Sequence, residues 1–134
     1  MRTTTWAMPR RCLTELARES ERRGGARVSR IVGFVDLRVG QRAGKVIDQA
    51  TDLAGGYLVG LRHVAGWDPD PKTPVMRGAP PSALMGDPEW RAGFKELVDR
   101  GLPFDALVFH PQLGDVRDLA VPPTRSWLVT PASI

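Results

Sequence analysis

The sequence predicts an α/β fold in which parallel strands alternate with helices. Apolar segments rich in β-branched or aromatic residues occur at 28–37, 57–64 and 104–110. Segments of helical periodicity separate them, and glycines or prolines mark most of the boundaries. Alternation of this kind favours a parallel sheet with helices packed on it. The expected order is an N-terminal helix followed by β-α-β-α-β-α, with right-handed crossovers.

The composition is that of one ordinary globular domain. The chain has 134 residues, of which 42% are hydrophobic and 25% are charged. No apolar run approaches the ~18 residues of a membrane span, and the first residues lack the apolar core of a secretory signal. A single cysteine, Cys12, excludes an intramolecular disulfide and a cysteine-based metal cluster. The expected location is therefore cytoplasmic.

Residues 1–27 are expected to form a basic helical arm. Residues 1–45 carry 11 basic and 4 acidic side chains. The segment 11–23 has helical spacing of its apolar residues and ends at a glycine pair. Its arginines are mixed with glutamates, which favours a solvated helix face over a nucleic-acid surface. No nucleic-acid-binding motif accompanies them, so neither nucleic acid nor membrane is an expected partner.

The first two strands and the helix between them have clear signals. Segment 28–37 is almost continuously apolar from Ile31, which is typical of a strand covered on both faces. Gly40 breaks it, and the apolar residues of 41–54 then fall on one helical face. A glycine pair stops that helix before the strand at 57–64.

The second half of the chain begins with a loop at 65–86 that contains five prolines and is expected to be irregular. Asp87 and Pro88 then open the clearest helix, since aspartate caps free backbone N–H groups and proline suits the first helical position. Gly101 ends it. A strand at 104–110 and a short helix at 114–120 follow. Residues 122–134 are expected to form a proline-containing tail, with a weak strand signal at 126–130.

Polar residues lie where the predicted strands end, which is where ligands collect in parallel α/β folds. Asp36 and Arg38 follow the first strand, Arg62 and His63 end the second, and His110 ends the third. Each histidine fits two interpretations. In a functional role it donates to a substrate oxygen, shuttles a proton or ligates a metal, and in a structural role it caps the strand end and bonds a neighbouring carbonyl.

Arg62 also fits two interpretations. Its guanidinium suits a substrate carboxylate, which it would hold by two parallel hydrogen bonds. The alternative is a structural ion pair with Asp36 or Asp68. Asp68 and Asp70 alternate with prolines, a pattern more typical of a turn than of a metal site. Trp67 and Trp90 are expected to pack rather than to stack on a ligand.

Four segments in register resemble amidohydrolase family 2, the amidohydrolase-related, predicted metal-dependent hydrolases. They are IVGFVDLRVG (31–40), GLRHVAGWDPDP (60–71), DPEWRAGFKEL (87–97) and GLPFDALVFHPQLGDVRDLA (101–120). The resemblance covers about residues 14–121. It implies a (β/α)8 TIM barrel, zinc or manganese in intact members, and hydrolysis of a lactone or related carboxylate-bearing carbonyl substrate. Some relatives decarboxylate instead.

The chain also departs from this family. A complete barrel needs about 250 residues, the HxH metal motif is absent, and 122–134 contain no histidine. The resemblance therefore implies that 28–121 are an internal fragment, an incomplete barrel of three βα units. No metal and little hydrolase activity are expected of this chain alone, and its catalytic residues are unknown. The residues expected to bind substrate are Arg62, His63 and His110.

An incomplete barrel implies self-association, and a function of a different class is kept as the alternative. Open sheet edges present unpaired backbone groups, so the chain is expected to self-associate. The alternative function is a non-enzymatic α/β module that binds an anionic ligand or a partner through the basic N-terminal arm.

Overall fold

The computed structural model describes residues 12–120, with side chains from residue 15 onward. Three parallel strands form one sheet in the order β1-β2-β3. They are β1 (Ile31–Phe34), β2 (Leu58–Val64) and β3 (Phe104–Leu107). The predicted α/β class with a parallel sheet is therefore confirmed. The weak strand predicted at 126–130 lies outside the described residues.

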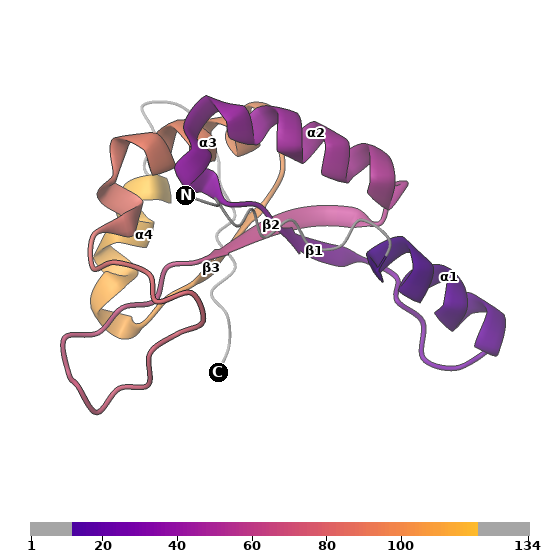
Figure 1. Cartoon of the computed structure of the whole chain (residues 1–134), viewed down its shortest axis with the longest axis horizontal. Helices are drawn as coiled ribbons and strands as arrows, with labels where there is room; N and C mark the ends of the chain where they lie inside the picture. The colour runs from indigo at the N-terminus through magenta and orange to yellow at the C-terminus, as the bar shows by residue number, and fades with distance from the viewer. Residues whose placement is uncertain (1–11, 121–134) are drawn as a thin grey trace, which may run out of the picture.

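Four helices accompany the sheet (Figure 1). They are α1 (Cys12–Arg23), α2 (Ala43–Ala54), α3 (Pro88–Asp99) and α4 (Leu113–Ala120). Helices α2 and α3 lie along the same side of the sheet, α1 lies near the start of β1, and α4 lies where the strands end (Figure 1). None of the described helices is long and apolar enough to cross a bilayer.

β1 and β3 are shorter than the strands predicted at 28–37 and 104–110. For β1, a local hydrogen bond explains why the strand ends early. Asp36 accepts a hydrogen bond from the backbone N–H of Arg38 and caps a 3-10 helical stretch, Leu37–Arg42. Gly40 interrupts that stretch with a φ of 63°. After β3, another 3-10 turn, His110–Gln112, begins at His110. His110 therefore lies beyond the strand rather than on it.

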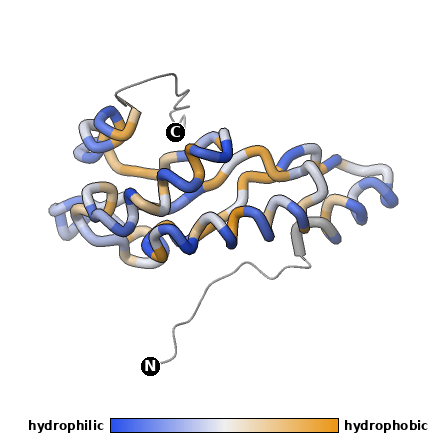
Figure 2. Tube along the Cα trace, turned by 90° about the horizontal axis from the view of Figure 1, so that it is seen from above, coloured by the Kyte–Doolittle hydropathy of each residue, from blue (hydrophilic) through white to orange (hydrophobic). Residues whose placement is uncertain are grey.

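The core lies between the sheet and helices α2 and α3. Figure 2 shows hydrophobic strand segments beside helices that carry hydrophilic residues on their outer turns. Trp90 of α3 is fully buried, stacks on Phe94 at a centroid distance of 5.5 Å, and meets Phe104 of β3 edge-on at 5.7 Å. Aromatic pairs in these geometries add to the free energy that burial itself contributes. The predicted packing role of Trp90 is thus confirmed.

The two faces of the sheet differ. Leu61 and His63 are buried, and His63 contacts Trp90 of α3, so this face points toward the helices. Val32, Arg62 and Asp105 alternate with these buried positions along the strands; Val32 is 43% exposed. No described helix packs on their side (Figure 1). We call the side formed by Val32, Arg62 and Asp105 the uncovered face.

One irregularity changes which residues of β2 share a face. Ile31 pairs with Leu58 but Val32 pairs with Gly60, so β2 carries one extra residue there. A Cβ on Gly33 would meet both Leu58 and Leu61, which therefore lie on the same side. Strict alternation along 57–64 would group Tyr57 and Val59 with Leu61 and His63, and this grouping is wrong because a bulge resets the alternation.

Candidate functional site

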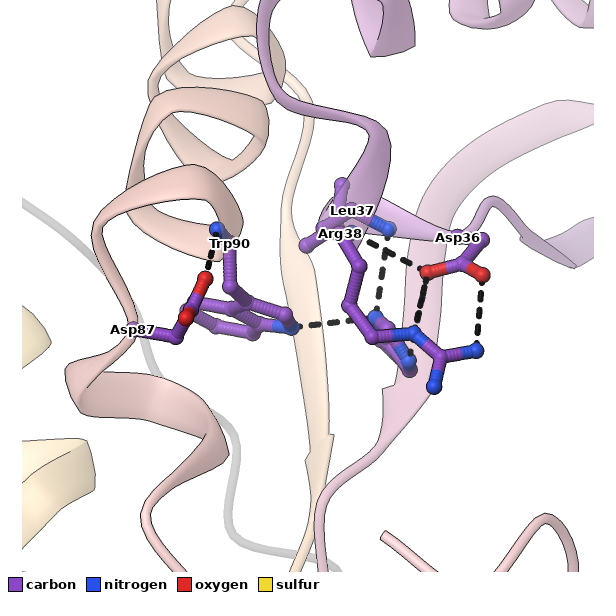
Figure 3. A network of polar contacts seen from close by, with 6 residues as sticks. Asp36, Leu37, Arg38, Asp87 and Trp90 are labelled. Atoms are coloured by element: carbon purple, nitrogen blue, oxygen red, sulfur yellow. Dashed lines mark hydrogen bonds and ion pairs between the residues drawn. The ribbon is translucent and has the colours of Figure 1, made fainter. Parts of the chain in front are cut away.

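Residues from three elements meet where β1 and β2 end (Figure 3). Asp36, Leu37 and Arg38 follow β1, His63 lies on β2, and Trp90 lies on α3. The bend that Asp36 caps after β1 brings this segment over the end of β2. We refer to Asp36, Arg38, His63 and Trp90 as the His63 cluster.

The hydrogen bonds of His63 define its protonation. Its Nδ1 atom lies 3.0 Å from the indole Nε1 of Trp90 and 3.3 Å from the backbone nitrogen of Leu37. Both groups can only donate, so Nδ1 accepts and carries no proton. The neutral ring therefore holds its proton on Nε2. Nε2 lies 3.9 Å from Oδ1 of Asp36, too far for a hydrogen bond.

Burial keeps His63 neutral. The residue is 5% exposed, and this burial lowers its pKa from 6.5 to about 4. The negative charge of Asp36 opposes the change in pKa, and the positive charge of Arg38 adds to it. At neutral pH the ring is thus an uncharged donor next to a carboxylate.

Asp36 is held by Arg38 in a two-pronged ion pair. Oδ1 accepts from Nε of Arg38 at 2.9 Å, and Oδ2 accepts from Nη2 at 2.8 Å. Burial, the largest single influence, raises the pKa of Asp36, but the hydrogen bonds and charge of Arg38 together outweigh it. The net pKa lies below the ordinary value, so Asp36 is ionised at neutral pH and its charge is compensated by Arg38.

The cluster suits hydrogen-bond donation and positioning better than proton transfer or nucleophilic attack. It contains one ionised carboxylate, one neutral imidazole with its free proton on Nε2, and one guanidinium. Within residues 12–120, no three His, Cys, Asp or Glu side chains come together as a group that would hold a metal ion.

Arg62 lies on the uncovered face and not beside His63. Its Nε donates to Oδ2 of Asp105 at 2.9 Å, and Nη2 bonds the same oxygen. The two residues are direct partners in the β2–β3 register. The alternative predicted for Arg62 was an ion pair with Asp36 or Asp68. Arg62 does form an ion pair, but its partner is Asp105, because the β2–β3 register places Asp105 directly opposite Arg62.

His110 is exposed and stands at the start of the turn before α4. Its side chain makes no hydrogen bond to another described residue. The structure therefore does not bring the three predicted substrate-binding residues together. His63 is buried toward the helices, Arg62 lies on the opposite face, and His110 follows β3.

Two residues that the sequence did not mark as site residues take part in the strand-end structure. Trp90 was expected to pack, and it also donates to His63. Gln112 is 4% exposed, and its Oε1 accepts from the backbone nitrogens of Trp67 at 2.7 Å and Phe109 at 3.3 Å. Its Nε2 donates to the carbonyl of Ala65. Gln112 therefore ties the segment after β2 to the segment after β3. The sequence places Gln112 just after the third strand, but it does not indicate these hydrogen bonds.

The predicted turn after β2 is confirmed. The backbone nitrogen of Asp70 donates to Oδ1 of Asp68 at 2.8 Å, and that of Lys72 donates to Oδ1 of Asp70 at 2.9 Å. Both carboxylates thus serve local turn geometry, as aspartates in such turns commonly do.

Comparisons with family models, with curated proteins and with solved structures found no match to this chain. The resemblance to amidohydrolase family 2 rests on the four sequence segments alone. It therefore stays a prediction.

Proposed function

We propose that this chain is part of a metal-dependent hydrolase of the amidohydrolase type, acting on a lactone or related carboxylate-bearing carbonyl substrate, and inactive by itself. Decarboxylation of such a substrate belongs to the same proposal. The observation that carries it is the one-sided sheet: three parallel strands adjacent in chain order, with α2 and α3 on the same side. In a (β/α)8 barrel the helices lie outside and the opposite face of the sheet lines the interior.

The uncovered face corresponds to the barrel interior in this proposal. It carries Val32 and the Arg62–Asp105 ion pair. Branched apolar side chains are typical of barrel interiors, and neighbouring strands would bury this ion pair. Nε and Nη2 of Arg62 bond Asp105, so in this proposal a substrate carboxylate binds the remaining N–H groups of the guanidinium, and Asp105 keeps its place.

The carboxyl ends of the strands are where the chemistry of barrel enzymes takes place. Exposed His110 is available there for direct contact with a substrate. His63 is buried and acts as a positioning residue: it holds the backbone of Leu37, the residue that follows Asp36. By holding Leu37, His63 fixes the position of Asp36 and Arg38, which are then the polar groups that face a substrate after β1.

Zinc or manganese, which the resemblance implies, does not fit the described residues. Nδ1 of His63 already accepts from two donors, and Oδ1 and Oδ2 of Asp36 both accept from Arg38. A metal would have to displace these bonds, and three ligands are not grouped within residues 12–120. Ligands from other strands are required, so no reaction step is assigned to a metal here.

The coding sequence on either side of this chain tests the proposal. Translated in all frames, it is expected to encode an HxH motif upstream and a histidine-bearing strand downstream. If neither is present, the hydrolase proposal fails.

Metal analysis of the purified chain provides a second test. We expect less than stoichiometric zinc and manganese, and no lactonase activity when either metal is added. One tightly held ion per chain, or metal-dependent lactone hydrolysis, would contradict the view that the ligands lie elsewhere.

A further inference from the structure

A concave site lies at the opposite end of the sheet from the His63 cluster, where the strands begin. It is a hollow of about 410 Å³ between the end of α1, the segment that leads into β1, and the α2–β2 turn. Volumes of this size are typical of small-ligand sites. The polar side chains that line it are Glu21, Arg27, Ser29, Arg30 and Tyr57.

The two lining arginines are not neutralised by carboxylates. All 15 Asp and Glu residues of the sequence fall within the part whose side chains are described. Ion pairs in that part engage other basic residues, and none involves Arg27 or Arg30. Both side chains are exposed. Nη1 of Arg30 donates to the carbonyl of Ser29 at 2.7 Å, and the other guanidinium N–H groups of Arg30 are available to a ligand.

The one carboxylate in the lining already has a partner. The hydroxyl of Tyr57 donates to Oε1 of Glu21 at 2.6 Å. This hydrogen bond raises the pKa of Tyr57, while the positive charges of Arg18 and Arg27 act in the opposite direction. Arg18 therefore adds a third positive charge close to the hollow.

The carbonyl ends of α1 and α2 lie next to the hollow and oppose an anion. Each carries the equivalent of roughly half a negative charge. Together with Glu21 they offset about two of the three positive charges of the arginines, so the local charge stays positive.

We propose that this hollow binds a small phosphate-bearing anion. Guanidinium groups match phosphate oxygens with paired, charge-assisted hydrogen bonds, and Ser29 adds a hydroxyl donor to the lining. The hollow lies at the end of the sheet where the strands begin, and the His63 cluster lies where they end. Anion binding in the hollow therefore does not depend on the proposed hydrolase function. It also gives the basic N-terminal region a defined anion-binding role.

Titration of the full chain with inorganic pyrophosphate tests this inference. Calorimetry is expected to show saturable binding of one pyrophosphate, and backbone NMR signals of residues 27–30 and 55–57 are expected to shift. The double variant Arg27→Ser/Arg30→Ser is expected to weaken binding at least about tenfold, because it removes both guanidinium groups that bond the phosphate oxygens. Arg27→Lys/Arg30→Lys retains the charge and is expected to recover part of the affinity.

The matched control is Arg22→Ser/Arg23→Ser. It removes the same two charges from arginines that are paired with Glu19 and do not line the hollow. Pyrophosphate affinity is expected to stay within a factor of about three of the parent, since long-range charge effects are screened. Absence of saturable binding would overturn the inference. So would equal weakening by both double variants, because that result indicates attraction to net charge only.

Discussion

The imidazole of His63 makes the stability of this chain sensitive to acid. Its pKa is about 4 in the folded state, against 6.5 for an ordinary histidine. Between these values the unfolded chain binds a proton that the folded chain excludes, so the free energy of unfolding falls as the pH drops. From pH 7 to pH 4 the expected loss is about 3 kcal/mol, since one pKa unit corresponds to about 1.4 kcal/mol. The ionised Asp36 adds a loss of the same sign at still lower pH.

Urea denaturation followed by tryptophan fluorescence at several pH values measures this loss. His63→Gln removes the titrating ring and is expected to flatten the dependence between pH 6.5 and pH 4, although the variant is less stable at neutral pH. His110→Gln replaces the exposed histidine and is expected to leave the slope unchanged. A parent protein of constant stability across this range would contradict the assignment of His63 as a buried neutral ring.

Trp90→Phe tests the hydrogen bond within the same cluster. The variant keeps an aromatic ring but removes the N–H that lies 3.0 Å from Nδ1 of His63. Loss of a donor to a buried acceptor is expected to cost about 1–3 kcal/mol of unfolding free energy. The pKa of His63 is expected to rise above 4, because the bond favours the neutral ring.

NMR titration of the histidine ring nitrogens measures that pKa. Trp67→Phe is the control, because Trp67 is 38% exposed and bonds Gln112 through its backbone. An unchanged pKa of His63 in Trp90→Phe would show that the indole does not set its protonation.

The sequence predicted where the polar residues of the site lie, but not which hydrogen bonds they form. Asp36, Arg38, Arg62 and His63 were expected at strand ends because short apolar segments mark where strands stop. The bond from Trp90 to His63 joins residues 27 positions apart on a helix and a strand. Periodicity predicts which face of a helix is buried, but it does not predict which polar atom of the buried side chain meets which partner.

Helix α3 and the stretch after β1 are packed backbone to backbone. A Cβ on Gly93 would overlap the carbonyl oxygen of Leu37, and no rotation of a side chain relieves this overlap. Gly93→Ala is therefore expected to lower the unfolding free energy by about 1–3 kcal/mol, as overpacking typically does. The change would also move Leu37 relative to His63.

Gly114→Ala is the matched control, since Gly114 lies in α4 and a Cβ there meets no atom within 4 Å. Alanine favours the helix by up to about 1 kcal/mol over glycine, so this variant is expected to be as stable as the parent or more stable. Urea denaturation at pH 7 compares the two. Equal stability of both variants would show that the close approach of α3 is not required.

The elements that were predicted well are those whose boundaries are marked by capping residues, prolines or glycines close together in the sequence. Helix α3 begins after Asp87, whose Oδ1 accepts from the nitrogen of Trp90 at 2.9 Å, and it continues with Pro88. The end of β1 and the bulge in β2 were missed for another reason. Segment 31–37 remains apolar beyond the strand because Val35, which follows β1, and Leu37, the first residue of the 3-10 stretch, are both buried. Hydrophobicity alone therefore does not distinguish a buried strand from a buried turn.

At the scale of the whole molecule, the described residues form one layer of helices on one face of a small sheet. The parallel arrangement was predictable from the alternation of elements. The sequence did not predict that helices cover only one face of the sheet. This depends on the face on which each connecting helix packs, and helical periodicity does not specify that face. A three-stranded parallel sheet with one covered face is unusual for an isolated unit, since parallel sheets normally have both faces buried.

The uncovered face therefore leads us to expect that the chain self-associates. Val32 is 43% exposed on it, and the outer edges of β1 and β3 have no neighbouring strand within residues 12–120. Sedimentation velocity over a range of concentrations is expected to show oligomers.

Val32→Glu places a charge on this face and is expected to shift the chain toward monomer, because burying an unpaired carboxylate opposes association. Val75→Glu adds the same charge in the loop, where Val75 is 80% exposed, and is expected to leave association unchanged. If both variants associate like the parent, the contact surface lies elsewhere, and the uncovered face does not drive assembly.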